Sequence, residues 1–303
     1  MLQLVRLDEG HIEDLVALST KLGWDYAPPE LRLLLTVGIA YGHVNEEGRV
    51  VSSAAVFPYE GLASIGGVMV DPSQRRQGLG TKVMERVLEE VPDIPTMLCA
   101  TAQGKFLYEA MGFHTVGTLH KYLAERYVPV KETLETAEGP KLELFRAGNA
   151  HELEALRFDD GFDLAPIRSA DFERILELDA LSIGARRRKF LQMRIAQASD
   201  GMVLRKAGEI VGFALAVQGP IYRVIGPVVA PDAQLALMLV EHLARRHDGA
   251  LRIDIPTEQT ELVEAMPLRG FHLANVPPIM LIGGEQLPPR HSSLFAISSQ
   301  AYG

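Results

Sequence analysis

Residues 68–82 are the most informative segment of this 303-residue chain, and they run Val68-Met69-Val70-Asp71-Pro72-Ser73-Gln74-Arg75-Arg76-Gln77-Gly78-Leu79-Gly80-Thr81-Lys82. The pattern predicts a strand that ends at the proline, then a basic turn, then a helix that begins at the glycines. The first N–H groups of a helix lack partners and its dipole is positive there, so this turn favours a bound anion. Glycine lets a phosphate approach the backbone, and arginine can pair with it. The nucleotide P-loop and the Rossmann loop do not fit, because no Gly-Lys-Ser/Thr closes the turn and no Gly-x-Gly-x-x-Gly directly follows the strand.

Two motifs suggest what this turn binds. The first, Arg75-Arg76-Gln77-Gly78-Leu79-Gly80, fits the pattern Arg/Gln-x-x-Gly-x-Gly/Ala at every fixed position, and a Val-x-Val-x-Pro strand precedes it. The second is Leu107-Tyr108-Glu109-Ala110-Met111-Gly112-Phe113. In both, the chain resembles the GNAT superfamily, the GCN5-related N-acetyltransferases. This resemblance covers about residues 1–125. Residues 179–187, 225–230 and 253–256 of the second half resemble the C-terminal GNAT-like domain of two-domain bacterial acetyltransferases, so the resemblance extends over nearly the whole chain. It implies an α/β protein of tandem GNAT folds, each a twisted mixed sheet flanked by helices.

The resemblance also implies acetyl-CoA as co-substrate, lying between two splayed parallel strands at residues 63–70 and 96–100. Its pantetheine arm would pair with the backbone of Val68, Met69 and Val70. The N–H groups that would hold its pyrophosphate belong to Arg76, Gln77, Gly78, Leu79, Gly80 and Thr81. Candidates for the 3′-phosphate are Arg75, Arg76 and Lys82. Thr101 is a further candidate for a hydrogen bond to the cofactor, with a helix N-cap as the alternative.

Amine acetylation needs a route for the ammonium proton, donors for the oxyanion and an acid for the thiolate. Tyr108 matches the position that often serves as this acid in the family, and a ring packed beside the cofactor is the alternative. The family's frequent base, a glutamate on the strand before the loop, is absent. Glu60, the nearest carboxylate, lies in a turn signal, so we expect a water relay or a group from the second half of the chain.

Acceptor contacts in the family usually come from the loop between the first two helices, here Gly23-Trp24-Asp25-Tyr26-Ala27. Trp24 and Tyr26 are therefore candidates for substrate binding, and with Asp25 they could receive a cation. Core packing is the alternative for Trp24.

Strand and helix signals alternate in both halves of the chain, which indicates two diverged copies of one architecture. We expect an acetyl-CoA-binding domain at 1–128, a linker at 129–143 and a degenerate GNAT-like domain at 144–303. The second copy lacks the basic residues and glycines of the first loop, and Asp232 there is typical of a helix N-cap. We therefore expect it not to bind CoA. The run Arg186-Arg187-Arg188-Lys189 favours a solvated helix face, with a phosphate or CoA contact as the alternative.

Composition narrows the class of protein. Apolar residues make up 47% and charged residues 23%, and the net charge is −9, which argues against disorder and against a nucleic-acid or anionic-membrane binder. One cysteine allows no internal disulfide, and no Cys/His metal spacing occurs, so no metal is expected. The N-terminus has no signal-peptide pattern and no apolar run approaches about 18 residues, so we expect a cytoplasmic protein.

Together with these patterns, the resemblance implies an N-acetyltransferase that moves an acetyl group from acetyl-CoA to a primary amine of a small molecule by direct attack. Two other functions remain open. One is a CoA-binding sensor that has lost catalysis, and the other is a protein lysine or N-terminal acetyltransferase. The expected partner is a small amine, and neither nucleic acid nor membrane. The sequence leaves a homodimer open.

Overall fold

The computed structural model describes residues 2–130, 156–157, 161–289 and 291–303. Most of the linker predicted at 129–143 therefore lies outside the described residues. Within the described part of the chain, no helix is long and apolar enough to cross a membrane.

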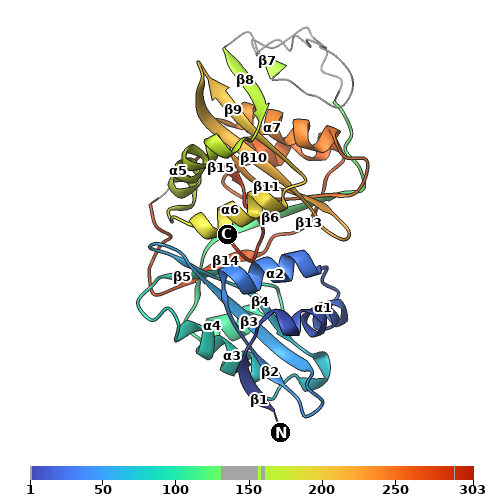
Figure 1. Ribbon diagram of the computed structural model, residues 1–303, viewed down its shortest axis with the longest axis vertical. Coiled ribbons are helices and arrows are strands. Elements are labelled where there is room, and N and C mark those ends of the chain that lie inside the picture. Colours follow the sequence, from blue (N-terminus) through green and yellow to red (C-terminus); the bar gives the residue numbers. More distant parts are fainter. Residues whose placement is uncertain (1, 131–155, 158–160, 290) are drawn as a thin grey trace.

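The first half alternates strands and helices around a mostly antiparallel sheet (Figure 1, blue to green). Its strands and helices are β1 (Gln3–Arg6), α1 (Ile12–Lys21), α2 (Pro28–Val37), β2 (Ile39–Val44), β3 (Val50–Pro58), β4 (Ala63–Val70), α3 (Leu79–Leu88), β5 (Thr96–Cys99), α4 (Lys105–Ala110) and β6 (His114–Ala124). The prolines at 28 and 29 occupy the first turn of α2, and Gly78 is the N-cap of α3, which begins at the glycines as the sequence predicts.

The second half follows the same order and ends in additional strands. Its elements are β7 (Leu156–Arg157), β8 (Phe162–Pro166), α5 (Phe172–Ile183), α6 (Arg188–Gln197), β9 (Asp200–Lys206), β10 (Glu209–Gln218), β11 (Arg223–Val229), α7 (Ala233–Arg245), β12 (Leu251–Pro256), α8 (Thr260–Ala265), β13 (His272–Asn275), β14 (Pro278–Ile282) and β15 (Leu294–Ala296).

The two halves exchange strands. β14, from the end of the chain, lies between β5 and β6 and so completes the sheet of the first half. In return, the second part of β6, from Leu119 to Ala124, pairs with β12 of the second half. One continuous sheet therefore crosses the molecule, and the two copies of the mixed α/β architecture share it (Figure 1).

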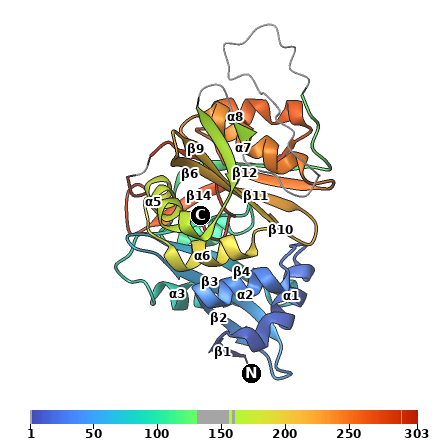
Figure 2. The same cartoon turned by 45° about the horizontal axis from the view of Figure 1, so that its top comes forward.

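Side chains also make contacts across the junction between the two halves. Helix α6 lies over α2 (Figure 2), and Arg194 of α6 makes a two-pronged ion pair with Glu30 of α2 at 2.8 and 2.9 Å. The ring of Tyr302 packs between Phe57 of β3 and Phe190 of α6, with ring centroids 4.7 and 4.9 Å apart. These contacts fix how the second half sits over β3 and β4.

A buried ion pair orders the last residues of the chain. Arg187 donates to the Asp179 carboxylate at 2.8 and 2.9 Å, and both side chains are fully buried. The remaining guanidinium nitrogen donates to the carbonyl oxygens of Tyr302 and Gly303. The prediction of a solvated face at 186–189 is thus wrong for Arg187, because a buried arginine is tolerated when its charge is paired and its N–H groups are bonded.

Candidate active site

Strands β4 and β5 diverge after a short parallel contact. They pair only from Ala63–Thr96 to Ile65–Leu98. Beyond this point β4 has one extra residue relative to β3, and Gly67 there adopts a positive φ of 61°. A bulge of this kind bends the strand away from its neighbour. From Val68 to Val70, no described strand pairs with the edge of β4 that faces β5, so this edge is free to accept an extended chain.

The predicted anion loop follows directly. A short 3-10 helix at Pro72–Gln74 leads to Arg75 and Arg76, both exposed, and neither has an ion-pair partner among the described residues. Gly78 has φ +74°, and α3 begins at the next residue. A Cβ at Gly80 would lie 3.2 Å from the Leu107 side chain, so the start of α3 closely approaches α4. The loop thus presents free helix N–H groups and two cations at the end of β4.

Asp71 holds the start of this loop. Its carboxylate accepts hydrogen bonds from Lys21 Nζ at 2.9 Å and from the Ser73 hydroxyl and backbone N–H at 2.7 and 2.9 Å. The Lys21 hydrogen bond, followed by those of Ser73, lowers the pKa of Asp71 to about 2. The side chain is only 10% exposed, whereas that of Lys21 is 61% exposed.

We expect Asp71→Asn to lower the free energy of unfolding by about 1 kcal/mol, since solvent screens the Lys21 charge. The folded pKa lies below the ordinary value, so this stabilisation is present above about pH 4 and is lost as the pH falls toward 2. Urea unfolding at several pH values measures it, with Asp14→Asn, whose carboxylate pairs with exposed Arg49, as the control. A difference from wild type that stays constant down to pH 2 would contradict this assignment.

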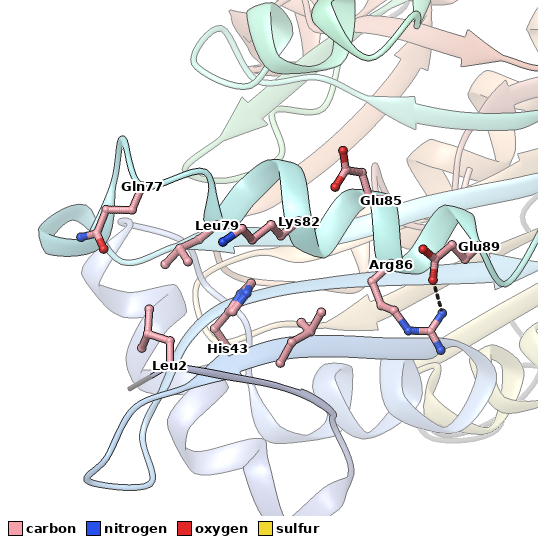
Figure 3. A pocket seen from close by; sticks show the side chains of 9 residues that line it. Leu2, His43, Gln77, Leu79, Lys82, Glu85, Arg86 and Glu89 are labelled. Atoms are coloured by element: carbon pink, nitrogen blue, oxygen red, sulfur yellow. Dashed lines mark hydrogen bonds and ion pairs between the residues drawn. The ribbon is translucent and has the colours of Figure 1, made fainter.

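Lys82 lies on another side of α3. It lines an open groove between α3 and the strands β1 and β2, with His43 facing it and Arg86 one turn along (Figure 3). Burial, and then the Lys82 charge, lowers the pKa of His43, whose Nδ1 is 2.7 Å from the Ser52 hydroxyl. Gly80, in contrast, faces α4. Of the three cations predicted for the 3′-phosphate, Arg75 and Arg76 lie on the loop, whereas Lys82 lines this groove together with the loop residues Gln77 and Leu79.

Tyr108 and Thr101 lie on the α4 side of the loop. The Tyr108 side chain is buried beside Phe113, and burial raises the pKa of its hydroxyl to about 12. Among the described residues this hydroxyl has no hydrogen-bond partner. Thr101 Oγ1 accepts a hydrogen bond from the Gly104 N–H at 3.1 Å and so caps the turn before α4. Thr101 therefore caps this turn, which was the alternative role considered for it. The Tyr108 hydroxyl remains available to bind or protonate a ligand.

The loop between α1 and α2 brings Tyr26 to the bulge of β4. The Tyr26 N–H donates to the Ser19 hydroxyl at 3.2 Å, and its ring meets Trp24 edge-on at 6.1 Å. Burial, followed by the charge of Glu30, raises the pKa of Tyr26, while a hydrogen bond with the Gly67 backbone opposes the rise. Trp24 and Tyr26 are both partly buried against the core that joins the halves. Tyr26 therefore lies where β4 and β5 diverge.

Three charged residues near this point were not predicted as site residues. Lys121 of β6 and Arg252 of β12 are close enough to Asp25 of the α1–α2 loop for their charges to interact, and Asp254 of β12 is hydrogen-bonded to Arg252. A signal was present in the sequence, since Arg252 and Asp254 interrupt the otherwise apolar strand 251–256. Their position became visible only with the exchange of strands, which brings β6 and β12 together.

The corresponding opening in the second half is filled. β11 and β12 pair in parallel from Arg223 to Ile225 and then separate, as β4 and β5 do. Here β15 pairs with the free edge of β11, and the Ile297 N–H donates to the Asp254 carbonyl oxygen of β12. Asp232 accepts a hydrogen bond from the Leu235 N–H at 2.9 Å, as predicted for an N-cap of α7. The chain itself thus occupies the place that the first half leaves open.

Comparison with known proteins agrees with this geometry. The chain is 31% identical to the uncharacterized N-acetyltransferase YitH of Bacillus subtilis strain 168, over 99% of this chain and 98% of that protein. The chain belongs to the GNAT acetyltransferase family. Models of the acetyltransferase (GNAT) domain match residues 39–115 and 175–296, one in each half. The family and the tandem organisation predicted from the sequence are confirmed.

Solved structures show the same GNAT fold over the whole chain. A protein from Pyrococcus horikoshii, proposed to be an acetyltransferase, has a TM-score of 0.76 at 19% identity and covers 100% of this chain and 96% of its own. A tandem GNAT protein from the clavulanic acid biosynthesis pathway has a TM-score of 0.62 at 16% identity, covering 94% and 100%. The protein is a two-domain GNAT acetyltransferase, from a family that uses acetyl-CoA as co-substrate.

Proposed function

We propose that the first half of this GNAT protein binds acetyl-CoA and transfers the acetyl group to a primary amine of a small molecule. The observation that best supports this is the free edge of β4 from Val68 to Val70, which ends at the glycine loop and at the start of α3. An extended pantetheine arm can pair with this edge as an added strand would. The pyrophosphate would then meet the helix N–H groups of residues 76–81, with Arg75 and Arg76 beside it.

The residues near the diverging strands fit direct transfer. The amine nitrogen would attack the thioester carbonyl carbon, and the C–S bond would break to leave a thiolate. Tyr108, whose hydroxyl is protonated at neutral pH, would give its proton to this sulfur. The β4 residues near the bulge include no glutamate, so the ammonium proton would leave through water or through a carboxylate such as Asp25.

A small acceptor suits the surroundings better than an extended peptide. The bulge region of β4 is approached by the α1–α2 loop through Tyr26 and by the last residues of the chain, where Ala301 contacts Gly66. The Ser64 hydroxyl donates to the Ala301 carbonyl oxygen at 3.0 Å, which ties these residues to β4. An acceptor therefore has to fit between the two halves.

Thiol release from acetyl-CoA over a panel of small amines tests the proposal. We expect stoichiometric release of CoA thiol with formation of the acetylated amine. Tight acetyl-CoA binding without release on any amine would favour the sensor function, and release only with peptides would favour a protein acetyltransferase.

We expect one acetyl-CoA site per chain in a calorimetric titration. The reason is that β15 and Ile297 already satisfy the edges of β11 and β12 that a second pantetheine arm would need. In addition, the acidic N-cap Asp232 stands where a phosphate would need positive charge. Two sites per chain would show that the second half also binds CoA.

A further inference from the structure

The pairing of β6 with β12 sets the positions of three charged side chains. Lys121 lies directly opposite Asp254, and Arg252 lies two residues before Asp254 on its strand. Directly opposed residues of an antiparallel pair share a face, and so do residues two apart on one strand. Lys121, Arg252 and Asp254 therefore all point to the same side of the sheet. We call these three residues the β6–β12 cluster.

Asp254, the anionic member of the β6–β12 cluster, already has hydrogen-bond donors on both of its carboxylate oxygens. Arg252 donates to Asp254 Oδ2 through Nε and Nη2 at 3.0 and 2.7 Å, and Gln300 donates to Oδ1 at 3.0 Å. The Asp254 side chain is fully buried. Its charge is thus used to hold Arg252, which leaves little capacity to neutralise a second cation.

The cationic members keep free donors. Within the described residues, Lys121 Nζ has neither an ion-pair nor a hydrogen-bond partner, and Arg252 Nη1 has no hydrogen-bond partner. The Arg252 side chain is only 14% exposed, and Lys121 is half-buried. Burial, and then the charge of Arg252, lowers the pKa of Lys121. An ammonium in this position would be stabilised by an anion supplied from outside the chain.

The β6–β12 cluster lies within electrostatic range of the α1–α2 loop, which itself reaches the bulge of β4. Arg252 interacts electrostatically with both Asp25 and Tyr26 of the α1–α2 loop. Tyr26 in turn contacts the backbone of Gly67 at the bulge of β4. A molecule that places its amine near Gly67 and Asp25 would therefore have the free donors of Lys121 and Arg252 within its reach.

We propose that the acceptor amine also carries a carboxylate, which Lys121 and Arg252 Nη1 bind, so that the acceptor is an amino acid or a related amino-carboxylate. This inference rests on the proposed function. Within the cluster, Asp254 offsets one of the two cations. Asp25 of the facing loop also interacts with Lys121 and Arg252, but the ammonium of the acceptor would take up its charge, so the cluster favours a monoanion. A zwitterion matches the site at both ends, with its ammonium toward Asp25 and its carboxylate toward the β6–β12 cluster.

The test compares an amino acid with its amide and its decarboxylated amine, which keep its side chain, and with an amine that carries a phosphate. The panel is leucine, leucinamide and isoamylamine, with phosphoethanolamine as a dianionic amine, and kcat/KM is measured for each with saturating acetyl-CoA. We expect the amino acid to exceed its amide and its decarboxylated amine by roughly tenfold or more, as expected for a charge-assisted hydrogen bond. Lys121→Gln should remove most of this preference, bringing the ratio down roughly tenfold, while acetyl-CoA affinity is kept.

Lys206→Gln is the matched control, since it removes one exposed positive charge on β9, at the far side of the second half's sheet. It should keep the full preference. The inference is overturned if the amide or the decarboxylated amine is acetylated as well as the amino acid, or if phosphoethanolamine is the best acceptor. It is also overturned if the simple amine is acetylated and leucine is not. Failure of acetyl-CoA to bind, or binding without acetylation of any amine, would instead overturn the proposed function.

Discussion

Gly78→Asp is expected to abolish acetyl-CoA binding while the protein stays folded. Gly78 is exposed, and a Cβ there would meet no atom within 4 Å, so the new side chain has room. Its φ of +74° is one that aspartate adopts more readily than most residues. The carboxylate would stand at the start of α3, where the pyrophosphate is proposed to bind. Two like charges about 4 Å apart repel by about 4 kcal/mol near a protein surface, which corresponds to roughly a thousandfold loss of affinity.

Gly48→Asp is the matched control for this variant. Gly48 has φ +77°, is exposed, and also has no atom within 4 Å of a Cβ, but it lies in the turn between β2 and β3. Calorimetric titration should find wild-type affinity for Gly48→Asp and no measurable binding for Gly78→Asp, with equal thermal unfolding temperatures. A folded Gly78→Asp protein with unchanged affinity would refute the assignment of the loop.

Tyr108→Phe is expected to lower kcat by roughly 100-fold or more, the loss typical of a general acid. The hydroxyl has no hydrogen-bond partner among the described residues, so phenylalanine should fit without loss of stability. Acetyl-CoA affinity should change little, because the proposed contacts to CoA come from the loop and from β4.

Tyr127→Phe provides the comparison, since Tyr127 is a buried tyrosine of the second core, away from the loop. Steady-state kinetics and a CoA titration of both variants separate chemistry from binding. Normal turnover in Tyr108→Phe would show that Tyr108 is not the general acid and only packs beside the cofactor. A loss of turnover in Tyr127→Phe of similar size would mean that the effect is structural.

The features that local chemistry controls could be predicted from the sequence. The turn at 71–80 is one, because a proline, two arginines and two glycines each impose their own constraint on a short segment. The N-cap at Asp232 is another, since the carboxylate and the helix N–H group that it accepts from are three residues apart. The order of strands and helices from β1 to β6, and from α5 to α8, also followed from the spacing of apolar residues.

The features that depend on distant pairing could not be predicted. The apolar segment 278–282 is a typical strand, but nothing within it indicates that it joins β5 and β6 of the other half. The same is true of β15, which fills the second opening. Arg187 looked solvated within a basic run, because its buried partner Asp179 becomes adjacent only when α5 and α6 fold together. The β6–β12 cluster was missed for the same reason.

A crystal structure of the full chain grown with CoA would test the central claim most directly. The account predicts the pantetheine arm along β4 between Val68 and Val70, and the pyrophosphate at the N–H groups of residues 76–81. It also predicts that β15 stays paired with β11. CoA bound between β11 and β12 in place of β15, or bound away from the loop at 75–80, would contradict it.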